Sequence, residues 1–225
     1  MIIDGIKYES KVNGWALVAN ISNYNSHVIL PQEINSLPII EIANTAFSDG
    51  EDIETLEIPD TVQCIGMYAF SGCRNLKTVV ERKTNFKLTQ KELLLRDGAF
   101  IGCSRLKSVM LNKCIVLAGK SVFQRCHHLE QIGERNQIYG VRVPDFCFQA
   151  CVSLEYLTFM SNSVELGNNV FNWCTALKTL TFWSQIVDCD YNDTWDSLRG
   201  KKIICTPTCN LANLAYDGVD IQIAY

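Results

Sequence analysis

The hydrophobic positions of the chain recur with a period close to 23 residues. Six phenylalanines set the register, at successive spacings of 23, 30, 23, 25 and 23 residues: Phe47, Phe70, Phe100, Phe123, Phe148 and Phe171. Three positions after the last five of them stands a cysteine: Cys73, Cys103, Cys126, Cys151 and Cys174. Aliphatic residues fill the sixth position, from Ile53 to Leu177, and the ninth, from Leu56 to Leu180. Four aligned columns across six windows indicate an internal repeat.

Each repeat predicts two short elements. The Phe-x-x-Cys-x-x-Leu part places apolar residues three apart, which is typical of a turn of α-helix or of 3₁₀-helix. The next part, such as residues 177–182, alternates apolar and polar side chains, which predicts a strand. One such unit is too small to bury its apolar side alone, so stacked copies must bury it against each other. The predicted fold is an α/β solenoid, a right-handed superhelix of short strands and short helical or 3₁₀ turns with capped ends.

The repeat explains five of the 11 cysteines. Because they share one position, we expect them to form an inward-facing ladder of free thiols, a role for a small apolar group. The odd total also argues against the disulfide framework of a small secreted scaffold. The remaining six lie off the ladder: Cys64, Cys114, Cys147, Cys189, Cys205 and Cys209.

The repeat unit resembles the BspA-type leucine-rich repeat family. The residues that carry the resemblance are Ile65-Gly66, Ala69-Phe70, Cys73, Leu76 and Val79, and again Leu166-Gly167, Phe171, Cys174, Leu177 and Leu180. The resemblance covers residues 28–183, with a degenerate leading repeat over 28–42. It implies an adhesin-like role, because many relatives act in adhesion or host-surface interaction, often at the cell surface.

The sequence predicts three regions. Residues 1–27 form an N-terminal hairpin cap around the turn signal Asn13-Gly14. Residues 28–200 hold about six full repeats and the degenerate first one. Residues 201–225 form a C-terminal cap, with a closing strand and a short helix, as the family resemblance implies. Two insertions interrupt the period and are expected to be loops, at 81–96, where residues 88–95 are expected to form a short helix, and at 134–140.

Interface-forming residues gather on the outward columns of the strands, eight, ten and twelve positions after each phenylalanine. The C-terminal half of this surface carries Tyr156, Met160 and Trp183, with Met110 further along. Tyr, Trp and Met are enriched in interface cores. Neighbouring strands lie about 4.8 Å apart, so we predict a partner-binding patch formed by Tyr156, Met160 and Trp183. The alternatives are that the C-terminal cap covers them or that they are scattered surface side chains.

The chain offers no set of residues for catalysis. Its three histidines are His27, His127 and His128. Cys126 precedes His127, but the ladder position turns its thiol inward. Zinc would need clustered ligands, and the pairs Cys147/Cys151 and Cys205/Cys209 lack a second matching pair. The acidic run Asp188, Asp190, Asp193 and Asp196 does not match a calcium loop. We therefore predict a protein that is not an enzyme and has no metal or cofactor.

Charge and hydropathy narrow the partner. A net charge of −4 and a pI near 5.4 argue against nucleic-acid binding. No apolar run suggests a membrane span, and the N-terminus shows no signal peptide, which by itself favours the cytoplasm, whereas the family resemblance favours the cell surface or secretion. We predict a monomeric interaction module that binds a protein or surface-glycan partner. The alternative is an intracellular scaffold or regulatory repeat protein that is not exported.

Overall fold

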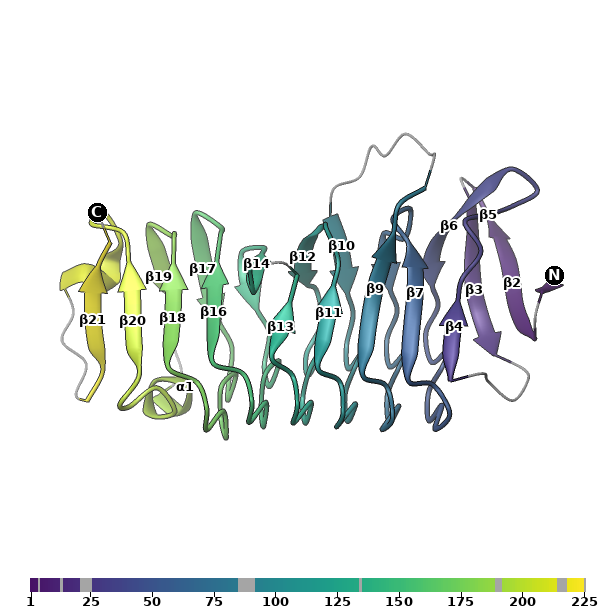
Figure 1. The fold of residues 1–225 in the computed structure, drawn as a ribbon. Helices are drawn as coiled ribbons and strands as arrows, with labels where there is room; N and C mark the ends of the chain where they lie inside the picture. Colours follow the sequence, from purple (N-terminus) through teal and green to yellow (C-terminus); the bar gives the residue numbers. More distant parts are fainter. Residues whose placement is uncertain are drawn as a thin grey trace.

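The chain winds into a row of stacked coils with its two termini at opposite ends (Figure 1). The computed structural model describes residues 1–3, 5–12, 14–20, 26–84, 92–133, 135–188, 192–213 and 218–224. A typical coil contains one short strand before its phenylalanine and one after its leucine. The repeat solenoid expected from the sequence is therefore confirmed. Helix is scarce in the described ranges, where only α1 (Asn192–Asp196) and the 3₁₀-helix η1 (Asn210–Asn213) occur.

The strands that follow each leucine line one side of the coils, which we call the front face. In the N-terminal half they form a five-stranded parallel sheet. Its members are β4 (His27–Ile29), β7 (Thr55–Pro59), β9 (Thr78–Arg82), β11 (Ser108–Met110) and β13 (Gln131–Ile132). In the C-terminal half the front strands are β16 (Tyr156–Phe159), β18 (Thr179–Phe182), β20 (Lys202–Cys205) and β21 (Asp220–Ile223).

The strands before each phenylalanine form the opposite side. In the N-terminal half they are β6 (Leu37–Ile42), β8 (Cys64–Ile65), β10 (Glu92–Leu95), β12 (Cys114–Leu117) and β14 (Gln137–Tyr139). In the C-terminal half they are β15 (Arg142–Val143), β17 (Ser163–Leu166) and β19 (Ile186–Asp188), which form a separate three-stranded sheet.

The six phenylalanines stack in one interior file, as the register predicts. Neighbouring rings lie 5.0, 5.2, 5.4, 5.8 and 6.0 Å apart between centroids, with interplanar angles of 13° or less. The six rings are at most 1% exposed. Full burial of one such side chain stabilises the fold by about 1.5–3 kcal/mol, so this file is a principal source of coil-to-coil cohesion.

The cysteine ladder is also confirmed, and the structure gives it a second role. The five thiols are at most 4% exposed. Each donates a hydrogen bond to the carbonyl oxygen of the preceding coil's phenylalanine, for example Cys103 Sγ to Phe70 O at 3.0 Å and Cys174 Sγ to Phe148 O at 2.9 Å. Cysteine at this position therefore fills a small apolar space and also satisfies a buried acceptor.

The expected helical turns at the phenylalanines are not confirmed. Bonds from Cys73 N to Phe70 O and from Leu76 N to Cys73 O close turns of helical spacing. However, a residue with positive φ stands two positions after every phenylalanine, and this prevents the turn from growing into a right-handed helix. These residues are Asp49, Gly72, Gly102, Arg125, Ala150 and Trp173. The fold is almost entirely β-strand and turn, so the α part of the predicted α/β class does not describe it.

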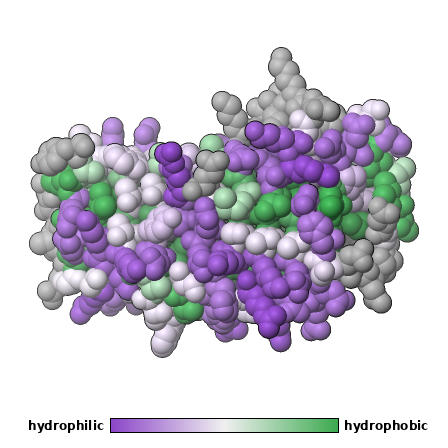
Figure 2. All heavy atoms as spheres, viewed as in Figure 1, coloured by the Kyte–Doolittle hydropathy of each residue, from purple (hydrophilic) through white to green (hydrophobic). Residues whose placement is uncertain are grey.

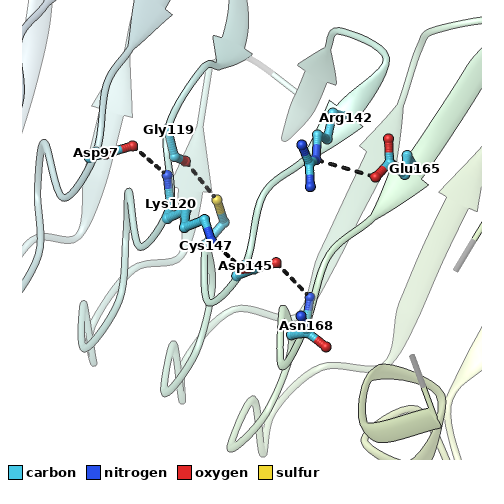
Figure 3. A network of polar contacts seen from close by, with 8 residues as sticks. All are labelled: Asp97, Gly119, Lys120, Arg142, Asp145, Cys147, Glu165 and Asn168. Carbon is cyan, nitrogen blue, oxygen red and sulfur yellow. Dashed lines mark hydrogen bonds and ion pairs between the residues drawn. The ribbon is translucent and has the colours of Figure 1, made fainter. Parts of the chain in front are cut away.

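A polar ladder links the turns between neighbouring coils (Figure 3). The Oδ1 atom of Asp97 accepts from Lys120 N at 2.8 Å, and that of Asp145 accepts from Asn168 N at 3.0 Å. The next coil places glycine beside each acceptor, and a Cβ atom at Gly119 would lie 2.0 Å from Asp97 N. The glycine of the repeat motif is thus required wherever an Asp or Asn side chain of the preceding coil crosses it.

The N-terminal end of the solenoid is closed by antiparallel strands. The strands β2 (Ile6–Lys11) and β3 (Gly14–Asn20) form a hairpin, and β3 pairs in parallel with β6. Two shorter antiparallel strands extend this end, β1 (Ile2–Ile3) against β2 and β5 (Glu33–Ile34) against β6.

At the C-terminal end, β20 is followed by η1, and β21 then pairs in parallel with β20.

Parts of both stretches that were expected to be loops form strands. Within 81–96, β9 continues to Arg82 and residues 92–95 form β10. The helix expected over 88–95 is therefore wrong for 92–95, and residues 88–91 lie outside the described part. Within 134–140, residues 137–139 form β14. Both strands pair with neighbouring strands of the sheet, β10 with β8 and β12, and β14 with β12 and β16.

Among the helices of the described residues, none has the length and hydrophobicity that crossing a membrane requires.

Candidate partner-binding surface

The front face is interrupted between β13 and β16. Strand β14 pairs with β12 on one side and with β16 on the other, and β13 and β16 are not paired to each other. The 13-stranded sheet therefore passes through β14 from the back strands of the N-terminal half to the front strands of the C-terminal half. We call this missing pairing between β13 and β16 the break. It falls in the repeat with two extra residues between its phenylalanines.

The side chain of Asn136 bridges the two sides of the break. The residue is fully buried, and its backbone has a positive φ of 51°. The side-chain oxygen accepts from Ile132 N at 2.6 Å, and the side-chain nitrogen donates to Glu130 O at 3.0 Å and to Tyr156 O at 3.1 Å. The amide thus replaces backbone partners that a paired strand would supply.

The break leaves backbone donors without their usual acceptors. Elsewhere the N–H group seven positions after a phenylalanine donates to the equivalent carbonyl of the preceding coil, as from Lys107 to Lys77 at 2.7 Å and from Lys178 to Glu155 at 2.8 Å. At the break, Asn136 occupies the carbonyl of Glu130 instead. Within the described residues, the N–H groups of Glu155 and Tyr156 have no such acceptor.

A groove of about 520 Å³ lies on the front face at the break. Its walls include Glu130 from one side, Val152, Glu155 and Tyr156 from the other, and Ala176 from the next coil. Tyr156 is 49% exposed and Val152 is 36% exposed. The groove thus combines an aromatic side chain and two small apolar side chains with walls that are mainly polar.

Two carboxylates flank the groove. Glu130 pairs with Lys107 at 3.4 Å through Oε2, and Glu155 pairs with Lys178 at 2.7 Å through Oε1. About half of each carboxylate side chain is exposed, so these ion pairs contribute little to stability. Both cations lie on the far sides, in the coils beyond the groove. The groove is therefore locally acidic, and Figure 2 shows hydrophilic side chains along the lower edge of this face.

The four predicted binding residues lie in three separate parts of the front face. Tyr156 lies at the start of β16, beside the groove. Met160 and Trp183 lie side by side beyond the other end of the strands, since Trp183 N donates to Phe159 O at 3.0 Å. At about 3.3 Å per residue, Tyr156 and Met160 are about 13 Å apart along the chain. Trp183 is 49% exposed, whereas Met160 is half-buried.

Met110 lies on the N-terminal side of the break. It is in register with Val80 on β9, which is in register with Glu57 on β7. Figure 2 shows hydrophobic surface over this half of the front face. Met110 therefore belongs to a different part of the face from the other three residues.

A second recess of about 310 Å³ opens beyond the other end of β13, with walls that include Lys113, Cys114 and Tyr139. Burial lowers the pKa of Lys113, and its ammonium group donates to the carbonyl oxygen of Val62. Burial raises the pKa of Tyr139, whose hydroxyl donates to Gln137 at 3.1 Å. These groups are engaged with the protein itself, so this recess is the weaker candidate.

The buried thiols of Cys126, Cys147 and Cys174 are unsuited to nucleophilic chemistry. Burial raises the pKa of Cys147 and of Cys174 to about 12, and it raises that of Cys126 further. A thiol in this state carries almost no thiolate at neutral pH. Cys126 donates to Phe100 O at 3.1 Å, so its hydrogen bond is not made to His127. Within the ranges that the structure describes, no group of three His, Cys, Asp or Glu residues could hold a metal ion.

The sequence pattern indicated Tyr156 as a candidate but did not predict the groove beside it. The two extra residues after Phe123 indicated an irregular repeat, and Asn136 stands among them. Nothing in that stretch indicates that it becomes a strand joining two sheets. The pair Glu130 and Glu155 could have been found by aligning the seventh position after each phenylalanine, where they are the two adjacent acidic residues.

Comparisons with known proteins agree with this architecture. Residues 40–178, more than half of the chain, match the model of the BspA type leucine rich repeat region in six copies. The crystal structure of a leucine-rich repeat protein from T. pallidum superposes with a TM-score of 0.57 at 23% identity, covering 79% of this chain and 90% of that one. A leucine-rich repeat protein from Bacteroides ovatus gives 0.45 at 18% identity, covering 93% and 80%. No curated protein matches the chain. By its sequence match and its architecture, the chain belongs to the BspA-type leucine-rich repeat family.

Proposed function

We propose that this protein is a non-enzymatic interaction module that binds a macromolecular partner on the front face of its C-terminal half. The observation that carries the proposal is the break, which opens a groove beside the half-exposed ring of Tyr156. Trp183 and Met160, just beyond the other end of β16 and β18, extend the candidate surface. Aromatic and methionine side chains of this kind are the usual anchors of protein interfaces.

The partner is proposed to be a protein, or a surface glycan if the protein acts as an adhesin. The adhesin-like role is what membership of the family suggests. Repeat solenoids present long, regular surfaces that are suited to extended contacts.

The second candidate is an intracellular scaffold, and the cysteines favour it. All ten cysteines among the described residues are free thiols. Free thiols persist in a reducing compartment, whereas exported proteins usually form disulfides. Fractionation of the cells that make the protein distinguishes the two, because an adhesin is recovered with the surface or the medium and a scaffold with the cytosol.

Affinity capture with the purified chain tests the binding surface. Partners of the wild-type chain are identified by mass spectrometry, and each purified partner is then measured against the triple variant Tyr156→Ala, Met160→Ala and Trp183→Ala. We expect at least about a tenfold loss of affinity, since interface hot spots contribute more than 1–2 kcal/mol each. The matched control changes to Ala two exposed residues of the opposite side, Val141 directly before β15 and Ile186 in β19. Equal affinity of the triple variant and wild type would exclude this surface.

A further inference from the structure

The groove at the break has polar features that define what it can bind. The N–H groups of Glu155 and Tyr156 have no acceptor among the described residues, although their counterparts in other coils are bonded. A backbone donor at the surface readily binds the carbonyl group of another chain. The groove therefore offers hydrogen bonds to an extended peptide segment.

The two carboxylates beside these N–H groups favour a cationic side chain in the groove. Glu130 and Glu155 each bind a lysine through one oxygen, Oε2 and Oε1 respectively, and their other oxygens have no partner in the part of the chain described. Six charged residues at the seventh position run in the order Glu54, Lys77, Lys107, Glu130, Glu155 and Lys178. The two glutamates are the one adjacent acidic pair in this row, and they meet at the groove.

The ring of Tyr156 favours arginine over lysine as the cationic side chain. A guanidinium group is planar, stacks on an aromatic face and forms paired hydrogen bonds with carboxylates. An ammonium group is compact and strongly hydrated, and it does not stack in this way. Two carboxylates and a half-exposed aromatic ring around one recess fit arginine better than lysine.

We infer that the groove accepts an extended segment of the partner protein that carries an arginine. The guanidinium group lies between Glu130 and Glu155 and against Tyr156. A neighbouring carbonyl of the segment accepts hydrogen bonds from the N–H groups of Glu155 and Tyr156. This inference rests on the proposed function, because it names the kind of partner that binds the same surface.

The inference is tested on the full ¹⁵N-labelled chain by NMR titration with the blocked peptide acetyl-Gly-Arg-Gly-amide. Two further probes are matched to it, one with citrulline, the neutral isostere of arginine, and one with lysine. The variants are Glu130→Gln with Glu155→Gln, and Tyr156→Leu. The control is Glu54→Gln, because Glu54 has the same register and an equal ion-pair distance of 2.7 Å to Lys77 but lies away from the groove. Unchanged spectral dispersion shows that each variant is folded.

The inference predicts that the arginine peptide binds at least about fivefold more tightly than the citrulline peptide, with amide shifts at residues 155 and 156. The double glutamine variant abolishes this preference, Tyr156→Leu reduces it, and Glu54→Gln retains it. Equal binding of the arginine and citrulline peptides overturns the inference, and so does equal binding of the arginine and lysine peptides.

The proposed function can fail separately from this inference. If a purified partner loses affinity for the Tyr156, Met160 and Trp183 triple variant but binds the double glutamine variant as it binds wild type, the front face is the interface and the arginine assignment is wrong. If the triple variant has no effect, the proposed function is wrong, whatever the peptides do.

Discussion

The side-chain nitrogen of Asn136 donates a hydrogen bond to the backbone carbonyl oxygen of Tyr156 at 3.1 Å, across the break. The same nitrogen donates to Glu130 O at 3.0 Å. This buried amide thus bridges the gap between β13 and β16, which are not paired with each other, and the groove stays open between these two strands. The regular repeat supplies stability, and the irregular repeat between Phe123 and Phe148 supplies the candidate binding site.

Replacement of Asn136 should weaken the solenoid at the break. Asn136→Gly removes three side-chain hydrogen bonds and keeps the positive φ, so we expect a loss of about 3 kcal/mol in the free energy of unfolding. Asn136→Ala should cost about 1 kcal/mol more, because alanine resists a left-handed backbone. Urea unfolding measures both, with Asn162→Ala at an exposed position as the control. A change below about 0.5 kcal/mol for both variants would show that Asn136 does not join the coils.

The motif glycine should be intolerant of a methyl group only where an acidic or amide side chain crosses it. Gly119→Ala places a Cβ atom 2.0 Å from Asp97 N, so we expect a loss of about 3 kcal/mol or more. Arg96 occupies the position equivalent to Gly119 in its own coil. The residue of the preceding coil that is equivalent to Asp97 is Met67, which has no carboxylate or amide group. Thermal unfolding of Arg96→Ala should change little. Equal effects of the two substitutions would contradict the coupling.

Stability should fall at alkaline pH because of the buried thiols. The pKa of Cys174 is about 12 in the fold, above its ordinary value of 9.0, because burial disfavours the thiolate. Its raised pKa therefore contributes stability that is complete below pH 9 and is lost as the pH rises from 9 towards 12. The loss is about 1 kcal/mol per pH unit for one thiol.

Comparison of wild type with Cys174→Ala across pH 8 to 11 cancels the contributions of other groups. We expect the free energy of unfolding of wild type to fall more steeply with pH. If the free energies of unfolding of the two proteins changed with pH in parallel, burial would not be raising the pKa of the Cys174 thiol. Native thiol labelling provides a second readout, since rapid reaction of the five ladder cysteines in the folded state would contradict their burial.

Trp173 should be a strained residue. It has a φ of 63° and is 69% exposed, at the column where Gly72 and Gly102 stand in earlier coils. Trp173→Gly should raise the free energy of unfolding by about 0.5 kcal/mol, because relief of the left-handed backbone exceeds the entropy of glycine. Gly102→Ala, where φ is 75°, should have the opposite sign. Destabilisation by Trp173→Gly would indicate that the indole ring stabilises the fold.

The sequence was sufficient to predict the regular part of the fold. The phenylalanine, cysteine and leucine columns share one period, and the same residues stack in the structure because each coil repeats its neighbour's contacts. The turns were misread because apolar residues three apart also fit a helix, and the positive φ at Arg125, Ala150 and Trp173 leaves no signal in those residue types.

The candidate site was less predictable than the core. Tyr156 stood out as an outward aromatic residue, but its separation from Met160 and Trp183 depends on the strand register. The groove depends on β14 joining two sheets, which is a long-range pairing set by tertiary packing. Asn136 in a polar segment looks like an ordinary loop residue until its three hydrogen bonds are seen.

Site-specific photo-cross-linking tests the binding claim most directly. The photoreactive residue p-benzoylphenylalanine replaces Tyr156 in one chain and Ile186, which is 54% exposed on the opposite strands, in another. With the purified partner, the chain labelled at 156 should give a cross-linked product and the chain labelled at 186 should give little or none. A product from position 186 without one from position 156 would show that the partner binds a different face.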